Sequence, residues 1–385
     1  MDTSAIPIFD HHAHPIYLER PWREEPLERY FNLSHDPMLL RSFGRDNLYF
    51  RRSLRDLAEF YGCEPRLEAV LEARQAPDYL ELCRWLFAEA NLTHWLVDDG
   101  LEGDGLWTVE ACGEHLPPVA RRLLRLESEF AKLIPKHDTA TKLLAAFDHH
   151  LRRAAPGVAG FKSVVAGRSG LEIARHNLVE IERAYSELRR STQLEQSPLI
   201  RSKPLLDAML WQALRVAQDN GKVVQFQAGL GGPDLDLRLA NPLHLRGVLE
   251  APDLRGVKIV LLHSYPFGRE AGYLASLYPN VYLDVGLGIP RASTAGMQAT
   301  LEEALHLAPV GKILFSTGGA YTPEVFWLAA RWGRRALRKV LEQTVHDGDL
   351  TKAEAEWAAL RILHDNAADL YGRGANPPTE TAVEV

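Results

Sequence analysis

The chain has 385 residues, of which 46% are hydrophobic and 25% are charged, which is the composition of an ordinary globular protein. The formal net charge of −7 and the lack of a basic block argue against a nucleic-acid partner, and no apolar run is long enough to span a bilayer. Three scattered cysteines without a C-x-x-C spacing, and no signal-peptide pattern before the first apolar segment, predict a cytoplasmic protein with reduced thiols.

Eight short apolar segments follow one another along the chain, with helical patterns between them. Most are β-branched or leucine runs without polar alternation, which is typical of parallel strands covered on both faces. The predicted strands span residues 7–9, 92–97, 123–126, 158–165, 223–226, 257–262, 281–283 and 313–315. Predicted helices include 202–220, 271–277 and 323–344, the last opened by a proline. This alternation predicts an α/β fold, and eight repeats indicate a (β/α)8 TIM barrel.

Two segments depart from a minimal barrel. Residues 15–91, between the first two strands, carry helical periodicity with many aromatic and arginine residues. We expect a helical insertion that caps the barrel mouth or contacts a partner subunit. Residues 373–385 are mostly polar and contain two adjacent prolines, so they are predicted to form a disordered tail. The remainder, residues 1–372, is predicted to be a single domain.

Histidines gather at the end of the first predicted strand. Functional groups of a TIM barrel lie at the carboxyl ends of its strands. The first strand ends in Asp10-His11-His12-Ala13-His14. Residues i and i+2 of a strand point the same way, so His12 and His14 are expected to aim at one place, as imidazole ligands of a divalent metal do. His11 is expected to face the other way and to form a hydrogen bond within the fold.

The second and third strand ends carry charged residues. Asp98 and Asp99 precede Gly100, a sequence that fits either a helix-capping turn or a place in a pocket. Arg125 and Glu127 are expected to share one face of the third strand. If both point inward they must be paired, because a lone buried charge is costly. An ion pair is the first interpretation, and contact with a substrate is the second.

The fourth, fifth and sixth strand ends supply further candidates. Lys162 lies in an apolar strand, where it must be paired, carbamylated or lowered in pKa, which favours a functional role. Arg168 follows that strand and could clamp a carboxylate, although a surface position is also open. Gln227 ends the fifth strand, as a hydrogen-bonding amide or a weak ligand. His263 ends the sixth as a ligand or acid/base, with Tyr265 beside it.

Together these residues resemble the amidohydrolase superfamily. More narrowly, they resemble the amidohydrolase-related branch (amidohydrolase 2) whose barrel is fused, in some fungal and bacterial proteins, to a glutamine-synthetase-like domain. The resemblance covers nearly the whole chain, most weakly through the insertion. The matching stretches are residues 10–14, 97–101, 160–171, 225–237, 259–274, 280–284 and 309–337.

The resemblance implies a metal at the barrel mouth. Its ligands are the first-strand His-x-His, histidines that end the fifth and sixth strands, sometimes a fourth-strand lysine carbamate, and an eighth-strand aspartate that also serves as general base. The matching positions are His12, His14, Lys162 and His263. Gln227 stands where the fifth-strand histidine is expected, and Gly318 stands where the aspartate is expected.

Three hypotheses follow. In the first, the protein is a hydrolase that cleaves an amide or a related C–N or ester bond of a small polar, carboxylate-bearing substrate. In the second, it is a metal-independent lyase, decarboxylase or specialised biosynthetic hydrolase on the same barrel. In the third, it is a non-catalytic binding or assembly subunit. We expect a small-molecule substrate, a homo-oligomer, and a glutamine-synthetase-like protein as a candidate partner.

The hypotheses give the residues different roles. For the hydrolase, His12 and His14 would hold a divalent metal, with zinc the first choice, and His263 would orient or protonate the substrate. The substrate itself would contact Arg168, Gln227 and Glu127. For the metal-independent enzyme, proton transfer would fall to His263, Lys162 and Tyr265. The two departures from the family pattern leave both versions open, with the metal present or absent.

Overall fold

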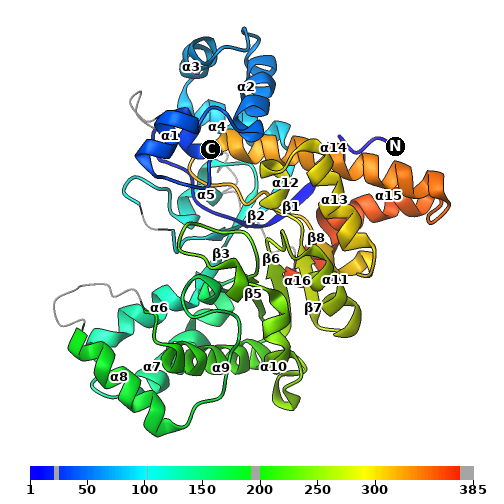
Figure 1. The fold of residues 1–385 in the computed structure, drawn as a ribbon. Coiled ribbons are helices and arrows are strands. Elements are labelled where there is room, and N and C mark those ends of the chain that lie inside the picture. Colours follow the sequence, from blue (N-terminus) through cyan, green and yellow to red (C-terminus); the bar gives the residue numbers. More distant parts are fainter. Residues whose placement is uncertain (21–25, 102, 192–199, 373–385) are drawn as a thin grey trace, which may run out of the picture.

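The computed structural model describes residues 1–20, 26–101, 103–191 and 200–372. The segment predicted to be a disordered tail, 373–385, lies outside the described residues. Eight parallel strands pair in sequence order around one sheet, with helices outside them (Figure 1). The strands are β1 (Ile8–Ala13), β2 (Leu92–Asp98), β3 (Val119–Arg125), β4 (Gly160–Ser163), β5 (Val223–Gln227), β6 (Lys258–Leu262), β7 (Val281–Asp284) and β8 (Ile313–Leu314). The predicted (β/α)8 barrel is confirmed.

The loop after β8 closes the barrel onto β1. The Gly318 N–H donates to the His12 carbonyl at 3.2 Å, and the His14 N–H donates to the Gly319 carbonyl at 2.8 Å. Thr317 donates to the Asp10 carboxylate through both its amide and its hydroxyl. The two histidines of interest are therefore held at the seam where the first and last strands meet.

Helices occupy the intervals between strands. The longer ones are α5 (Val109–His115), α6 (Leu126–Leu133), α7 (Ala140–Ala154), α8 (Leu178–Ser191), α9 (Lys203–Asp219), α11 (Gly268–Leu277), α13 (Thr294–Leu305), α14 (Pro323–Asp347), α15 (Lys352–Leu360) and α16 (Asn366–Tyr371). Short turns are η2 (Ile134–Lys136), η3 (Ala155–Gly157), η4 (Val165–Gly167), η5 (Leu237–Leu239), η6 (Pro242–Leu245), α10 (Arg246–Leu249), η7 (Pro252–Leu254), α12 (Gly288–Arg291), η8 (Val310–Lys312) and the π-helical η9 (Arg361–Asp365). Among the described residues, none of these helices combines the length and apolarity that crossing a bilayer requires.

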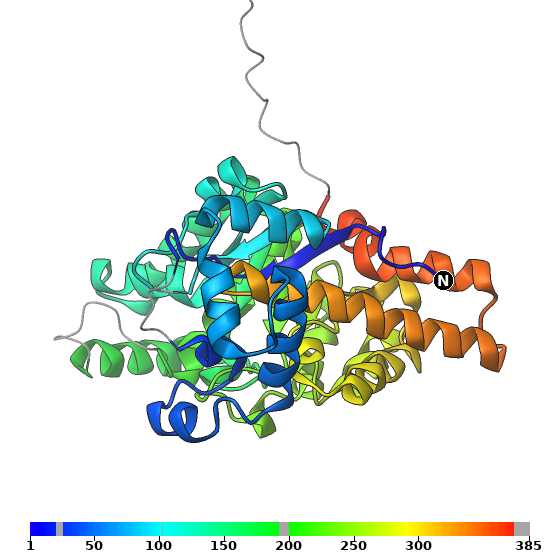
Figure 2. The ribbon, with the colours of Figure 1, turned by 90° about the horizontal axis from the view of Figure 1, so that it is seen from above.

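The predicted insertion is helical. It contains η1 (Leu27–Phe31), α1 (Pro37–Phe43), α2 (Leu48–Tyr61), α3 (Leu67–Gln75) and α4 (Tyr79–Glu89). Helices α2 and α4 both contact the barrel helix α14, and α2 runs across α14 in Figure 1 and in Figure 2, which is turned by 90°. Helix α2 also contacts α12, the short helix that follows β7. The insertion therefore reaches the carboxyl-end face of the barrel, where function is expected.

The barrel interior is apolar at its amino end. Phe9, Leu96, Val223 and Val260 point inward there, and Tyr371 from α16 joins the same buried cluster. Burying these side chains stabilises the fold by about 2 kcal/mol each. The histidines of the β1 end, Asp98, Lys162 and His263 lie at the opposite end, where the strands end.

Candidate active site

The end of β1 is irregular, and the irregularity decides where its histidines point. The register of β1 against β2 shifts between Asp10 and Ala13. The His12 and His14 rings lie 5.1 Å apart between centroids, so the structure brings them together as their spacing predicts. His11 bonds through Nε2 to Asp284 Oδ1 at 3.1 Å and stacks over the Tyr371 ring. The predicted internal hydrogen bond of His11 is therefore present.

Gln225 determines the tautomer of His12. His12 Nδ1 lies 2.9 Å from Gln225 Oε1, while Gln225 Nε2 donates to the His11 carbonyl and to the Tyr371 hydroxyl. An amide oxygen only accepts, so Nδ1 carries the proton and Nε2 keeps its lone pair. That Nε2 is buried and has no hydrogen-bond partner among the described residues. Burial, with help from nearby Lys162, holds the pKa of His12 well below its usual value.

His14 is also a neutral imidazole. Its Nδ1 lies 3.1 Å from the Asp98 carbonyl oxygen, which can only accept, so this nitrogen carries the proton. Burial lowers the pKa of His14 to about 3, although the nearby Asp98 carboxylate acts in the opposite direction. Near pH 7 the end of β1 therefore presents two neutral rings, each with one nitrogen lone pair.

Asp98 is the most heavily bonded carboxylate of the mouth. It lies at the end of β2 and is fully buried. Arg125 grips both of its oxygens, with Nη2 2.7 Å from Oδ2 and Nε 3.1 Å from Oδ1, and Lys162 Nζ lies 3.0 Å from Oδ2. Burial alone would raise the pKa of Asp98, but Arg125 and Lys162 hold it well below the usual range. Burial lowers the pKa of Lys162, and Asp98 counteracts that effect.

The predicted ion pair between Arg125 and Glu127 is wrong. β3 ends at Arg125, and Glu127 lies in the first turn of α6, so the two residues do not alternate along a strand. Arg125 pairs with Asp98 instead. Glu127 is buried beneath the mouth, where it accepts hydrogen bonds from the Ser163 hydroxyl at 2.6 Å and the Val164 N–H at 3.1 Å. In this position Glu127 holds the end of β4, and it does not line the mouth cavity.

His263 faces the β1 histidines from the end of β6. Its ring centroid lies 5.0 Å from that of His12. The residue has a φ of +58°, and its backbone N–H donates to Asp284 Oδ2 at 3.1 Å. His263 Nδ1 lies 3.2 Å from the same oxygen, poorly aligned for a hydrogen bond but close enough for an ion pair. Burial lowers the pKa of His263, and Asp284 opposes that effect.

A cavity of about 380 Å³ opens over these groups. His14, Lys162, Gln227 and His263 line it near the strand ends. Its walls carry a net positive charge: among the described residues that line it there are five cations and one carboxylate, Asp234, while the buried Asp98 behind the wall pairs with two of the five. The five are Arg29, Arg125, Lys162, Arg168 and Arg291. A cavity with this charge attracts an anionic ligand.

Some of the remaining predicted site residues line the cavity and others do not. Arg168 lines the cavity and is only loosely paired, with Nη1 3.8 Å from Asp234 Oδ2. Gln227 lines it as well, at the end of β5. Tyr265 does not line the cavity, and its side chain is 43% exposed. Gly318 does line it, with a φ of +58°, and a β-carbon there would lie 2.9 Å from the Leu287 side chain.

Sequence reasoning left some functional residues out. Asp98 was left between a turn and a pocket role. Gln225 and Asp284, which orient His12 and His263, were not singled out. A signal existed for both, because each is a polar residue within or at the end of a buried apolar strand. For Arg291 we find no local signal, since its burial depends on a contact with the distant insertion.

The family assignment follows from comparison with known proteins. The profile of the family described as Amidohydrolase matches residues 148–373, more than half of the chain. The chain belongs to the amidohydrolase family. This amidohydrolase is also 32% identical to protein fluG of Emericella nidulans, across 97% of the chain and 46% of fluG. It thus spans about half the length of the curated relative that it matches.

Solved structures give the same picture of this amidohydrolase. A protein of Lactobacillus casei ATCC 334 assigned as a metal-dependent hydrolase has a TM-score of 0.86 and 30% identity, with 96% of each chain covered. Uronate isomerase of Thermotoga maritima has a TM-score of 0.68 at 15% identity, covering 96% of this chain and 95% of its own. At that identity the isomerase shows a shared fold alone.

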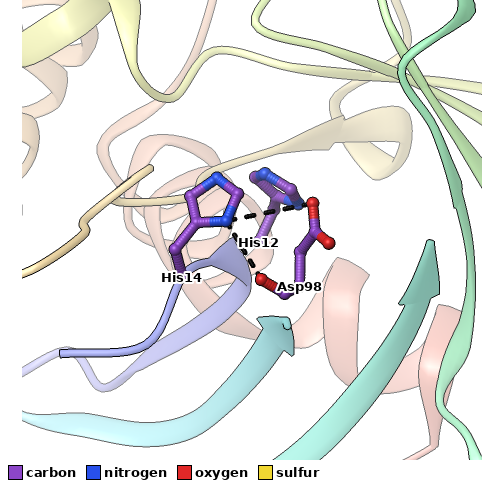
Figure 3. Close-up of side chains that lie close together, drawn as sticks. All are labelled: His12, His14 and Asp98. Atoms are coloured by element: carbon purple, nitrogen blue, oxygen red, sulfur yellow. Dashed lines mark hydrogen bonds and ion pairs between the residues drawn. The ribbon is translucent and has the colours of Figure 1, made fainter. Parts of the chain in front are cut away.

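The donor atoms at the mouth of this amidohydrolase form a possible divalent-metal site. Figure 3 shows His12, His14 and Asp98 turned toward one another, and one ligand atom from each lies within 4.8 Å of the others. The lone pair at His12 Nε2, buried and without a partner among the described residues, fits a metal ligand. The Asp98 carboxylate would have to be shared with Arg125 and Lys162. The set therefore fits a metal whose carboxylate ligand is also held by two cations.

Proposed function

We propose that this protein is an active hydrolase. It would cleave an amide, or a related C–N or ester bond, of a small polar substrate that bears a carboxylate. The observation that carries this proposal is the mouth cavity, which is lined by His14, His263 and several cations, with the unpartnered Nε2 of His12 buried next to these two histidines. Interactions with the reacting groups are stronger in a buried site that excludes water, and the cations would attract an anionic substrate. Arg168 is the candidate for the carboxylate, because its guanidinium is only loosely paired.

His263 is the proposed acid/base. A neutral imidazole can take the proton of an attacking water and return it to the leaving amine. Asp284 lies 3.2 Å from His263 Nδ1 and would stabilise the positive ring that forms between these two steps. Gln227, at the end of β5, can donate from its amide to the carbonyl oxygen of the substrate.

A divalent metal, zinc by its ligand types, would be held by His12, His14 and Asp98 and would supply an activated water. Gln225 has a supporting role in this arrangement. By accepting from His12 Nδ1 it keeps the lone pair on Nε2, which faces the site. The cations Arg125 and Lys162 keep Asp98 ionised, and they also weaken its attraction for another cation.

One observation favours a second candidate, a metal-independent enzyme on the same barrel. The Asp98 carboxylate is already paired, and the family's fifth- and eighth-strand ligand positions carry Gln227 and Gly318. In this version, His263 and Lys162 would exchange protons with the substrate directly. Tyr265, the third residue expected in this role, does not line the cavity.

Metal analysis and turnover together test the proposal. Protein purified without chelators would be analysed for zinc, iron and manganese, and then assayed on amides of glutamate and aspartate for released amine. We expect a metal content near one equivalent that His14→Ala abolishes, and turnover that His263→Asn abolishes. The exposed His244, which bonds only the Arg238 carbonyl, supplies the control His244→Asn.

The outcomes separate the candidates. Metal below roughly a tenth of an equivalent, with turnover that resists a chelator and is lost in His263→Asn, supports the metal-independent enzyme. Hydrolysis of no amide, ester or lactone, by metal-loaded or metal-free protein, overturns the hydrolase. A protein with no turnover of any carboxylate substrate would instead be a binding or assembly subunit.

A further inference from the structure

Arg291 is a partly buried cation that has no hydrogen-bond or ion-pair partner among the described residues. It ends α12 and lines the mouth cavity. Its Nε is fully buried, and within the part of the chain that the structure describes the side chain has no hydrogen bond and no ion pair. Its guanidinium lies over the face of the Tyr49 ring, with the guanidinium carbon 5.5 Å from the ring centroid. The Tyr49 hydroxyl is likewise buried without a hydrogen-bond partner among the described residues. Leaving such donors unpaired is costly, so a ligand that pairs them is favoured.

The helical insertion holds Arg291 in this position. Arg52 of α2 donates through Nη2 to the carbonyls of Pro290 at 2.6 Å and Ala292 at 3.1 Å, on either side of Arg291. The Arg52 guanidinium also stacks on Trp332, 4.0 Å from the ring centroid. A site whose backbone is pinned by a second element is preorganised, which lowers the entropic cost of binding.

Arg291 faces the other cations of the mouth across the barrel. It follows β7, whereas Arg125 ends β3 and Lys162 and Arg168 come from β4 and its following turn. In an eight-stranded barrel with strands in sequence order, β3 lies opposite β7. Arg291 therefore lies on the wall opposite the other three cations. His12, His263 and Gln227, from β1, β6 and β5, lie between them.

We infer that Arg291 is a specificity-determining residue that binds a second carboxylate, so that the substrate is a dianion with one carboxylate toward each wall and its reacting bond over the histidines. The planar guanidinium matches a carboxylate through two parallel hydrogen bonds, and the Tyr49 ring packs beside it. This inference rests on the proposed function, because the first carboxylate is the one assigned to Arg168. It also gives the insertion a role, since α2 supplies both Tyr49 and Arg52.

Binding of paired acids tests the inference without any turnover. Calorimetry would compare glutarate, a five-carbon diacid, with valerate, the monoacid of the same length. We expect the full-length protein to bind glutarate at least about tenfold more tightly than valerate. Arg291→Met should weaken glutarate binding by about tenfold and leave valerate binding unchanged. Arg66, an exposed arginine paired with Glu64 on the insertion, supplies the control Arg66→Met, which should change neither.

Several results would overturn the inference. One is equal affinity for the two acids in the unaltered protein, and another is an unchanged glutarate-to-valerate ratio in folded Arg291→Met. If that variant does not fold, Arg291→Lys keeps the charge but loses the two-pronged geometry, and the ratio should still fall. A protein that discriminates through Arg291 but cleaves no amide contradicts the hydrolase proposal alone. A protein that cleaves amides with no dependence on Arg291 contradicts the dianion inference alone.

Discussion

Arg125 and Arg291 are partly buried on opposite walls of one cavity, in opposite electrostatic settings. Arg125 meets Asp98 through two nitrogens, and Lys162 completes a compact cluster. Arg291 meets an aromatic ring and, among the described residues, no carboxylate. The paired wall satisfies its charges within the fold, whereas the unpaired wall leaves a charge for something else to satisfy. In this barrel, an arginine without a carboxylate partner in the described structure is therefore a better indicator of a binding site than a paired one.

We expect the largest effect on stability from neutralising Asp98, the carboxylate of the paired wall. Asp98→Asn keeps the shape but leaves Arg125 and Lys162 buried without a counter-charge, so the free energy of unfolding should fall by about 3–5 kcal/mol. Urea denaturation would measure it. Asp99→Asn is the control, because Asp99 pairs with Arg122 at a partly exposed position and should cost less than about 1 kcal/mol. Equal losses in both variants would contradict the difference between the clusters.

The histidines between the walls predict the pH dependence of stability. The pKa of His14 is about 3 in the fold against an ordinary 6.5, so as pH falls the unfolded chain takes up the proton first. The contribution of this group to the free energy of unfolding is therefore fully present above about pH 6.5 and is lost as pH falls toward 3. At pH 4.5 the loss is about 3 kcal/mol. Denaturation at several pH values should show a smaller slope in His14→Gln. If exposed His244→Gln reduces the slope equally, the explanation fails.

An aspartate at position 318, where the family resemblance leads us to expect one, tests the side of the mouth next to α12. Gly318→Asp places a side chain at a φ of +58° and 2.9 Å from the Leu287 side chain, so we expect a loss of about 2 kcal/mol in unfolding free energy. Gly348 has a φ of +84° and open space around it, so Gly348→Asp should pay the backbone cost alone. Thermal unfolding would compare them. A Gly318→Asp protein as stable as the original would show that the Leu287 side chain can move aside without a measurable cost in stability.

The unpaired wall should respond in the opposite direction to the paired one. Without ligand, Arg291→Met removes a partly buried charge that has no counter-ion in the described structure, so it should raise the free energy of unfolding by about 1 kcal/mol. Thermal unfolding in ligand-free buffer measures the shift. Arg52→Met should lower stability instead, because Arg52 donates to two carbonyls of the α12 segment. A destabilised Arg291→Met protein would mean that Arg291 is satisfied within the fold.

Local pattern was enough to predict the barrel and part of its site. The eight apolar runs carry their own strand signal, and the overlap with the observed strands follows from burial on both faces. His12 and His14 are two residues apart, so their convergence needs no distant information. His263 and Lys162 could be predicted because a titratable residue inside an apolar strand stands out in any sequence. For Arg125 and Glu127 the same reasoning failed, because the strand ends one residue earlier than predicted.

The sequence by itself determined the fold class, the end of the barrel that carries chemistry, and the histidines that mark it, because these depend on the periodicity of neighbouring residues. Only the tertiary structure decided which charges are neutralised. Asp98, Arg125 and Lys162 come from three strands, and Arg291 owes its place to an insertion more than two hundred residues away in the chain. Pairing across such separations depends on the register of whole elements against one another, which no local pattern records.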